Sequence, residues 1–462
     1  MDGEKMSSQF LGYPNEFAAE PMPTKQMVDL CKEHTLYTWS AGNTVNPLPI
    51  ARAEGVYLWT PEGQKILDFN AQLMSVLIGH AHPRVIAAMK RQLDELIFVY
   101  PQTATQVRAR LGKLLSEIVP GMSSFFFTLG GAEANENAVK MARLYTGRNK
   151  ILARYRSYHG GTHLTMSLTG DPRRWANEPG IPGVIRAFDP YEYRCSFGKS
   201  GCSSCDMPCL SHIEEMVMYE GPQNIAAVFI ESVTGTNGLI VPPEGYLQGL
   251  RKMCDKYGIL LICDEVMAGL GRTGAWFAVD NWGVTPDIIT MAKGLTSAYM
   301  PLGCVAMSTK IAEHFSKNVF YGGLTYNAHP MSLAAAVATL KVLEDDDLIG
   351  NAQRMGKVMA ELHQGLKAKH PSVGDVRSIG LFGVLELVKN RKTKEPMAPF
   401  NGNSPEMARL GAFFKEEGLA AFLHWNNVFT NPPLIINEEQ LREAFEIIDR
   451  GLDITDQAVV DA

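Results

Sequence analysis

The stretch Gly258-Ile-Leu-Leu-Ile-Cys-Asp-Glu-Val266 decides the fold class of this chain. It is a short apolar run that ends on a carboxylate, Asp264, and a second run, Pro286-Asp-Ile-Ile-Thr-Met-Ala-Lys-Gly294, ends on an amine, Lys293. Strands of parallel α/β sheets have this continuous apolar character because helices cover both of their faces. Ligands collect outside the carboxyl ends of such strands. We therefore expect Asp264 and Lys293 at one edge of a sheet, facing a ligand.

Segments with strand character and segments with helix character alternate between about residues 105 and 330. This alternation predicts an α/β fold with a mostly parallel sheet covered by helices. Besides the two runs above, we expect strands at 124–128, 151–153 and 226–230, and helices at 133–145 and 246–256.

The remaining parts of the chain differ in composition from this alternating region. Residues 1–45 are polar and predict an N-terminal arm, and residues 190–222 form an insertion rich in Cys, Ser, Gly and Pro. Apolar periodicity and turn residues further predict a hairpin at 56–69, helices at 85–96, 332–343 and 438–452, and a strand at 380–387.

Composition excludes several classes of protein. Apolar residues make up 46% of the 462 residues and charged residues 20%, which is typical of a globular protein. The net charge of −6 and the lack of a basic run argue against nucleic-acid binding. The N-terminus lacks the pattern of a signal peptide, and no apolar run reaches the roughly 18 residues of a membrane span. We expect a cytoplasmic protein without a membrane partner.

Two motifs precede Asp264 and add to the expected site. Thr128-Leu-Gly-Gly-Ala-Glu-Ala-Asn135 lies between a predicted strand and a predicted helix, where glycines and a helix N-terminus can bind a phosphate. Tyr158 in Tyr158-His-Gly-Gly161 could stack on a cofactor ring. Each motif has a structural alternative, since glycine is common at strand–helix turns and a tyrosine can simply cover the core.

Asp264 and Lys293 complete a set that suits pyridoxal 5′-phosphate (PLP). A carboxylate beside the pyridine nitrogen keeps that nitrogen protonated, and a buried lysine with a lowered pKa can bind the aldehyde covalently. Taken singly, Asp264 could cap a helix or form an ion pair, and Lys293 could be a solvated lysine. The four elements together occur in the order that a PLP enzyme needs.

At this point the chain resembles the class III aminotransferases, also called ω-aminotransferases. The resemblance extends from about Ala51 to Leu452 and includes the motifs above together with Asn70–Pro83, Gly269–Gly274, Thr325–Pro330 and Val376–Leu381. It implies PLP fold type I, with a large domain around a mostly parallel seven-stranded sheet and a smaller α+β domain built from both termini. We place the N-terminal arm and part of the small domain at 1–75, the large domain at 76–335 and the C-terminal small domain at 336–462.

The resemblance also implies roles for individual residues. Lys293 would bind the cofactor covalently and carry the proton, and Asp264 would pair with the pyridine nitrogen. Tyr158 and Val266 would pack on opposite faces of the ring. The phosphate would be bound by Gly131 and Ala132 of one subunit and by Thr325 of the other, which implies a homodimer, with a tetramer also open.

Substrate binding involves a second group of residues in the family. Arg377 matches an arginine that pairs with a glutamate, here Glu231, or receives a substrate carboxylate; a static structural ion pair is the alternative. Tyr100 and Trp425 match the substrate pocket. Many relatives carry a mobile arginine before the Asn431-Pro-Pro433 segment, but residues 421–427 contain none. His424, Trp425 and Asn426 are candidates for part of its role.

Four cysteines cluster in the insertion, at positions 195, 202, 205 and 209. Their spacing permits a zinc site with His212 as a spare ligand, but structural zinc sites usually show two close pairs of cysteines. We expect free thiols and no bound metal, with a redox disulfide as a lesser alternative.

The expected activity is transfer of an amino group from an ω-amino donor to pyruvate or another small α-keto acid. The pattern is most similar to taurine–pyruvate, β-alanine–pyruvate and amine–pyruvate aminotransferases. Two alternatives stay open: a decarboxylase, aminomutase or racemase on the same fold, and a non-catalytic metal-binding scaffold using the cysteines.

Overall fold

A computed structural model describes residues 22–199 and 205–460, and contacts along the chain divide it into two units. The first unit comprises residues up to 53 together with 58–65, and the second comprises 54–57 and 66–462. The first unit contains α2 (Thr24–His34) and a 3-10 turn, η1 (Gly42–Thr44). In it, the guanidinium of Arg52 lies 3.6 Å from the ring centre of Trp59.

A seven-stranded sheet forms the centre of the second unit, with strand order β4-β10-β9-β8-β7-β5-β6. Its strands are β4 (Met122–Thr128), β5 (Lys150–Arg154), β6 (Val184–Ala187), β7 (Ile225–Glu231), β8 (Leu260–Asp264), β9 (Ile288–Met291) and β10 (Gly303–Ser308). β10 is antiparallel to both of its neighbours, and the other pairs are parallel. The prediction of a mostly parallel sheet is therefore confirmed.

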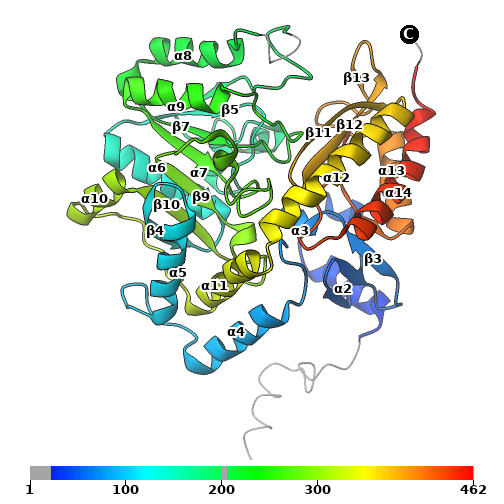
Figure 1. The fold of residues 1–462 in the computed structure, drawn as a ribbon, viewed down its shortest axis with the longest axis horizontal. Coiled ribbons are helices and arrows are strands. Elements are labelled where there is room, and N and C mark those ends of the chain that lie inside the picture. The colour runs from blue at the N-terminus through cyan, green and yellow to red at the C-terminus, as the bar shows by residue number, and fades with distance from the viewer. Residues whose placement is uncertain (1–21, 200–204, 461–462) are drawn as a thin grey trace, which may run out of the picture. The chain divides into compact units, whose positions relative to one another are not determined.

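The strands are apolar at nearly every position because both faces of the sheet are covered. In β8, Leu261 and Cys263 belong to one buried cluster, whereas Leu260 and Ile262 belong to another. The first cluster includes residues of α5 (Gln106–Ile118), α8 (Pro208–Glu220) and α9 (Tyr246–Tyr257), and the second includes residues of α6 (Gly131–Thr146), α7 (His163–Leu168) and α10 (Thr309–Lys317) (Figure 1). Burial on both faces removes the alternation of apolar and polar residues that a half-exposed strand would show.

The four helices predicted in this region, at 85–96, 133–145, 246–256 and 332–343, agree with the structure to within a few residues, whereas its other helices were not foreseen. Their bounds are α3 (Ala71–Met74), α4 (Pro83–Glu95), α5 (Gln106–Ile118), α6 (Gly131–Thr146), α7 (His163–Leu168), α8 (Pro208–Glu220), α9 (Tyr246–Tyr257), α10 (Thr309–Lys317) and α11 (Pro330–Asp345). Short 3-10 turns are η2 (Pro172–Asn177), η4 (Pro222–Asn224), η5 (Ala278–Trp282) and η6 (Lys293–Leu295).

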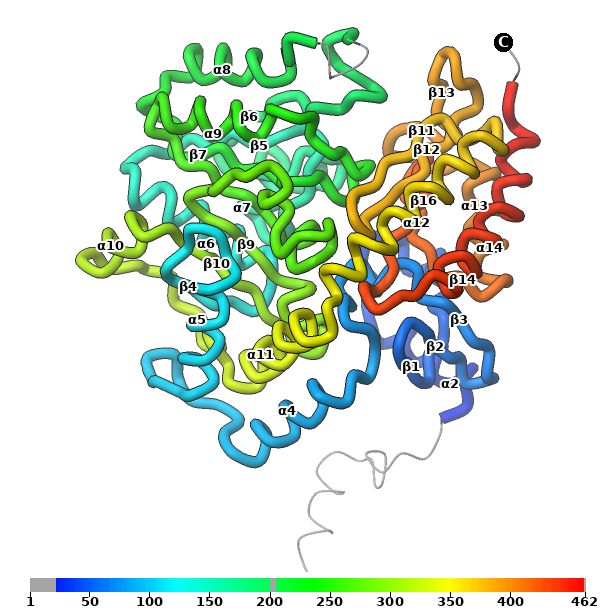
Figure 2. Tube along the Cα trace, in the orientation of Figure 1, coloured from blue at the N-terminus to red at the C-terminus, as the bar shows by residue number. Residues whose placement is uncertain are grey.

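A second, antiparallel sheet follows later in the chain, with strand order β11-β12-β16-β15 and β13 paired to β12. Figure 2 follows the chain from α11 into α12, which leads to this sheet. Its elements are α12 (Leu348–Lys369), β11 (Val373–Ile379), β12 (Phe382–Asn390), β13 (Glu395–Pro396), α13 (Pro405–Glu416), β14 (Leu419–Ala420), β15 (Phe422–His424), β16 (Asn427–Thr430) and α14 (Glu438–Asp456). The predicted strand and final helix are confirmed as β12 and α14, whereas the other elements of this region were not foreseen.

The hairpin predicted at 56–69 corresponds to β2 (Tyr57–Trp59) and β3 (Lys65–Asp68), and β1 (Arg52–Glu54) precedes it. β3 pairs in parallel with β14, so the early and late parts of the second unit share a sheet. The domain boundaries at 75 and 335 stay a prediction. No helix among the described residues is both long and apolar enough to cross a membrane.

Candidate active site

Asp264 is the last residue of β8, and it lies opposite Glu231, the last residue of β7, in the strand register. Its side chain is buried, and both of its carboxylate oxygens have hydrogen-bond partners. Oδ2 lies 2.8 Å from Nδ1 of His159 and accepts a 2.8 Å hydrogen bond from Nδ2 of Asn135, while Oδ1 accepts one of 3.0 Å from the Val266 amide. These contacts fix the carboxylate at the carboxyl edge of the sheet, as the sequence predicts.

Lys293 begins the turn η6, two residues after β9 ends. Its Nζ donates a 3.0 Å hydrogen bond to the carbonyl oxygen of Leu73. Burial lowers the pKa of the amine to about 8, although the carboxylates of Asp264 and Glu231 act in the opposite direction. Lys293 is therefore a far better nucleophile near neutral pH than an ordinary lysine, because only the neutral amine attacks a carbonyl.

The carbonyl that holds Lys293 belongs to an unusual turn. Residues 71–74 all have positive φ angles, between 46° and 62°, although none of them is glycine. Each such residue costs about 1–2 kcal/mol in a left-handed conformation. Asp68 supports the turn, because its Oδ1 accepts a hydrogen bond from the Gln72 amide and its Oδ2 lies 2.9 Å from Nε2 of His80. The turn persists because its surroundings impose it.

The N-terminus of α6 offers a cradle for an anion. A Cβ atom on Gly131, the first helical residue, would lie 3.0 Å from a methyl carbon of Val266. Gly160 has a φ of +135°, and a Cβ there would lie 2.5 Å from Cβ of Ala132. The loop after β5 therefore approaches the helix start closely only because residue 160 is glycine. Backbone N–H groups and the helix dipole make this position suitable for a phosphate.

Glu231 holds the loop that carries Tyr158. Its Oε1 accepts a 3.0 Å hydrogen bond from the Tyr158 amide, and its Oε2 accepts one of 2.7 Å from the Gly235 amide. Burial raises the pKa of this carboxyl above its ordinary value. The guanidinium carbon of Arg173 lies 3.7 Å from the centre of the Tyr158 ring.

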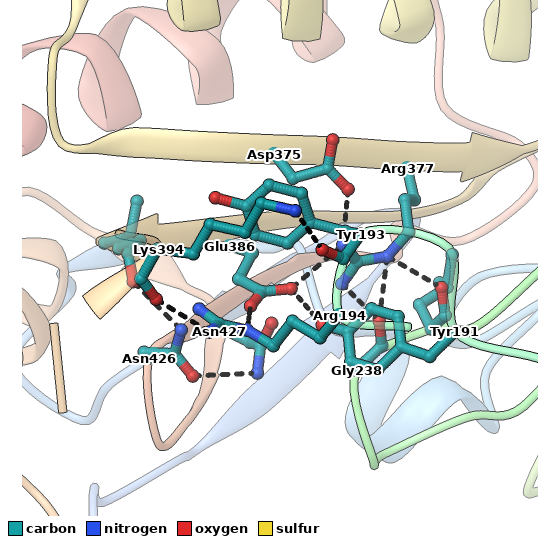
Figure 3. A network of polar contacts seen from close by, with 12 residues as sticks. Tyr191, Tyr193, Arg194, Gly238, Asp375, Arg377, Glu386, Lys394, Asn426 and Asn427 are labelled. Atoms are coloured by element: carbon teal, nitrogen blue, oxygen red, sulfur yellow. Dashed lines mark hydrogen bonds and ion pairs between the residues drawn. The ribbon is translucent and has the colours of Figure 1, made fainter. Parts of the chain in front are cut away.

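Arg377 is bound by carboxylates other than the expected Glu231. Its Nη1 lies 2.6 Å from Asp375 and 2.9 Å from Glu386, and its Nη2 donates a 2.6 Å hydrogen bond to the Gly238 carbonyl. Figure 3 shows this guanidinium enclosed by its partners. The described residues thus contain no Glu231–Arg377 ion pair, and the arginine has the contacts of the structural alternative.

The surroundings of Arg377 reinforce this interpretation. The Tyr191 hydroxyl donates a hydrogen bond to Glu386, and Nε of Arg194 donates one to the same carboxylate. Burial alone would lower the pKa of Arg377, but Tyr191, Glu386 and Asp375 outweigh it and raise that pKa. The network ties β11 and β12 to the segment around residues 191–194.

The other expected substrate and partner residues are Thr325, Tyr100 and Trp425. Thr325 is exposed, and Tyr100 retains 59% of its accessible surface. The Trp425 ring stacks on that of His424 at 4.2 Å and lies 4.5 Å from Phe400. The structure thus brings the expected cofactor residues of one subunit together, whereas Thr325 and Tyr100 face outward.

The cysteine cluster is only partly described. Cys195, Cys205 and Cys209 are free thiols, and Cys202 lies outside the described residues. Burial raises the pKa of the Cys209 thiol to about 11, and the neighbouring Cys205 and Cys195 act in the same direction. The prediction that no metal binds here stays a prediction.

Comparison with known proteins decides the family. The family model of class III aminotransferases matches residues 38–452. The chain is a class III aminotransferase. The curated relatives of this aminotransferase include a putrescine–pyruvate aminotransferase of Pseudomonas aeruginosa, 34% identical over 95% of this chain and 98% of the relative. A taurine–pyruvate aminotransferase of Bilophila wadsworthia is 33% identical over 94% of this chain and 98% of the relative.

Solved structures agree with this assignment. A taurine:2-oxoglutarate aminotransferase from Bifidobacterium kashiwanohense, in complex with PLP and glutamate, has a TM-score of 0.92 and 38% identity. It is matched over 96% of this chain and 100% of its own. An (S)-enantioselective ω-transaminase from Thermomicrobium roseum has a TM-score of 0.88 and 34% identity, over 94% of this chain and 100% of its own. The resemblance, PLP fold type I and PLP as the cofactor are thereby confirmed.

The residues of this aminotransferase suit PLP on their own chemistry. Lys293 offers an amine of lowered pKa, Asp264 offers a buried carboxylate, and the start of α6 offers N–H groups at a position where Gly131 leaves room. The sequence had not assigned a role to Asn135 or His159, although both lie inside motifs that it singled out. No local sequence pattern pointed to Arg173 or to a role of the Leu73 carbonyl in the site.

The pKa of Lys293 predicts how the apoprotein takes up its cofactor. Below about pH 8 the amine is protonated, so the rate of covalent PLP capture should rise about tenfold per pH unit and level off above about pH 8. Stopped-flow absorbance of bound PLP measures this rate. Capture that keeps rising towards pH 10.5, the ordinary value of a lysine, would contradict the effect of burial.

The Arg377 network predicts a stability effect. Arg377→Gln removes the cation that the buried Glu386 shares with Asp375, and leaves only Arg194 on Glu386 and Lys367 on Asp375, so the free energy of unfolding should fall by about 3 kcal/mol. Arg442→Gln is the control, because its ion pair with Glu438 is exposed and worth at most about 1 kcal/mol. Chemical denaturation of both variants measures the difference. An unchanged stability with weaker keto-acid binding would instead favour a substrate role for Arg377.

Proposed function

We propose that this aminotransferase moves an amino group from an ω-amino donor to pyruvate or a similar small α-keto acid. Taurine, β-alanine or a primary amine would be the donor. The observation that carries the proposal is the Lys293 amine, whose pKa is lowered to about 8 within electrostatic reach of the buried Asp264 carboxylate. The names of the putrescine–pyruvate and taurine–pyruvate relatives support this substrate class.

Each residue of the cluster has a proposed task. Lys293 binds the cofactor covalently, Asp264 pairs with its ring nitrogen, and Gly131 and Ala132 bind its phosphate through their N–H groups. When bound, PLP supplies an aldehyde that takes up amines and a ring that stabilises negative charge on the adjoining carbon. Tyr158 and Val266 confine the ring from its two faces.

Proton transfer falls to Lys293. Its amine, neutral for part of the time near pH 8, would take a proton from the substrate carbon that bears the amino group and would pass it to the carbon of the cofactor's former aldehyde, C4′. Asp264 is held in place for this step, because His159 and Asn135 contact the same oxygen at 2.8 Å each. The enzyme retains the amino group between its two half-reactions, so the proposal predicts ping-pong kinetics.

Glu231 acts as a positioning residue in this proposal. Its two oxygens each accept a backbone N–H, and one of these belongs to Tyr158 itself. It therefore fixes the place of the stacking ring without touching the substrate. A gate formed with Arg377 is not part of the proposal, because Arg377 has other partners.

The first test replaces the nucleophile and then surveys donors. Lys293→Ala should lose covalent PLP and at least about 10⁴-fold in transamination, because it lacks both the covalent anchor and the proton carrier. Lys310→Ala is the matched control, since that lysine is half-exposed and paired with Asp287. Alanine formation from pyruvate is measured with taurine, β-alanine, 4-aminobutyrate, putrescine and 1-phenylethylamine.

Two outcomes would overturn the assignment. One is retained transamination by Lys293→Ala. The other is release of carbon dioxide, or rearrangement or racemisation of the donor, without nitrogen transfer by the wild-type enzyme, which would favour a decarboxylase, aminomutase or racemase.

We also propose that the working unit is a homodimer, in which Thr325 reaches the cofactor of the partner subunit. Large apolar side chains on either side of Thr325 are more than half exposed on this chain, which is typical of an interaction surface. The ring of Phe98 lies 5.7 Å from that of Tyr326, so residues 97–100 adjoin the Thr325 segment. The exposed residues are Ile97, Tyr100, Val319, Tyr321 and Tyr326. A cytoplasmic location stays a prediction.

Tyr321→Asp tests the dimer. A carboxylate buried at an interface costs more than it gains, so the variant should dissociate at concentrations at least about tenfold higher than the wild type and bind PLP less well. Tyr219→Asp is the control, because that residue lies on α8 and is 83% exposed. Sedimentation velocity measures the assembly. A monomeric wild-type enzyme with full activity would contradict the proposal.

A further inference from the structure

The Lys293 amine meets its acceptor between two segments of unusual backbone conformation. One is the turn at residues 71–74. The other begins at Lys293 itself, which has a φ of +35°, and includes Ser297 with a φ of +51°. Such angles are unfavourable for residues with a side chain, so they persist only where the surroundings impose them. The Ile78 amide donates a 3.1 Å hydrogen bond to Oγ of Ser297, which joins the two segments independently of the amine.

Asp68 is the side chain that holds the first segment. It is completely buried, and its Oδ1 accepts hydrogen bonds of 3.4 Å from the Asn70 amide and 3.3 Å from the Gln72 amide. Its Oδ2 lies 2.9 Å from Nε2 of His80, which sets the plane of the carboxylate. One buried side chain therefore orients the backbone immediately before Leu73, whose carbonyl oxygen receives the amine at 3.0 Å.

The hydrogen bond to Leu73 matters because a free lysine amine has many orientations. While the amine is not joined to the cofactor, only contacts within the protein direct it. An N–H group that donates to a fixed carbonyl limits where the lone pair can point, and the orientation of a reacting group contributes strongly to its rate.

A carbonyl also suits both charge states of this amine. It accepts a hydrogen bond from the neutral amine and from the ammonium alike. A carboxylate in its place would favour the ammonium and so weaken the base. The Leu73 carbonyl can therefore hold Lys293 both before and after it takes up a proton.

We propose that Asp68 is a positioning residue for transamination: by fixing the turn, it keeps the Leu73 carbonyl where the Lys293 amine returns whenever the cofactor releases it. This rests on the proposed function, in which Lys293 binds PLP and carries the proton. Asp68 acts through the backbone and not on the substrate. Loss of its support should slow the steps in which the free amine attacks or takes a proton, without changing how tightly the amino donor binds.

The first measurement is PLP capture by the apoprotein at about pH 9, where the Lys293 amine is mostly neutral and a small change in its pKa has little effect. Asp68→Ala should slow capture by about tenfold, which corresponds to one net hydrogen bond. Asp68→Asn keeps an oxygen for the two amides but lacks the charge, so its rate should stay within about twofold of the wild type. Stopped-flow absorbance measures the rates, and circular dichroism checks that each apoprotein is folded.

Asn390→Ala is the matched control. The Asn390 Oδ1 also accepts hydrogen bonds from two backbone amides, those of Lys392 at 2.8 Å and Thr393 at 2.9 Å, in the turn between β12 and β13. Its loss removes the same kind of support from a different turn. Capture by this variant should match that of the wild type.

A second substitution tests whether the shape of the turn is what matters. Gln72 is exposed and has a φ of +46°, an angle that glycine adopts at little cost. Gln72→Gly should therefore restore most of the capture rate when it is added to Asp68→Ala, because the turn then forms with less support. Loss of the Asp68 charge would not be rescued in this way.

The donor half-reaction supplies a third readout. In single turnovers of the holoenzyme, with whichever of the five donors above reacts fastest, Asp68→Ala should lower the rate at saturation by about tenfold. The half-saturating donor concentration should stay within about twofold of the wild type. General damage to the site would change both values.

The outcomes separate this inference from the proposed function. Wild-type capture by Asp68→Ala, an equal loss in Asp68→Asn, or no rescue by Gln72→Gly would overturn the role of Asp68 while transamination stands. If the wild type transfers no amine from any of the five donors while capture follows the expected order, the proposed function fails and the positioning of the amine stands. If Asp68→Ala does not fold, His80→Ala replaces it, since it removes the contact to Oδ2; unchanged capture in that variant would contradict the inference.

Discussion

The whole site depends on one buried carboxylate, that of Asp264. A charge at this depth is tolerated only when its oxygens are hydrogen-bonded, and here three elements supply the donors. Asn135 comes from α6, His159 from the loop after β5, and the Val266 amide from the chain that follows β8. The hydrogen bonds to this one carboxylate therefore bring together the edge of the sheet, the loop that carries Tyr158 and the helix whose N-terminus we propose for the phosphate.

The parts of this arrangement that could be predicted are those with a local signal. Continuous apolar runs and the side chains at their ends identified β8 and β9, and with them Asp264 and Lys293. The glycines before α6 and after β5 were equally visible, because a close approach of backbone leaves no room for another residue. Asn135 and His159 lie in those motifs, but only the folded chain shows that both turn towards Asp264.

The choice of ion-pair partners could not be predicted, because it depends on which acids the fold brings near. Arg377 was expected to meet Glu231, yet β11 and β12 place Asp375 and Glu386 opposite one another in register. Two neighbouring carboxylates need a cation between them, and Arg377 supplies it. Glu231 instead accepts hydrogen bonds from two backbone N–H groups. Arg173 gave no signal either, since its position over the Tyr158 ring depends on its ion pair with Asp171 in the folded chain.

The left-handed turn at residues 71–74 links distant positions to the chemistry. Its shape would ordinarily call for glycine or asparagine, so the sequence of the turn does not encode it. Asp68 and His80 hold the shape, and the turn presents the carbonyl that binds the Lys293 amine. Anyone redesigning this enzyme should therefore treat residues 68–80 as part of its reactive machinery: substitutions there can retune the amine from outside the substrate pocket, and their effects will depend on one another.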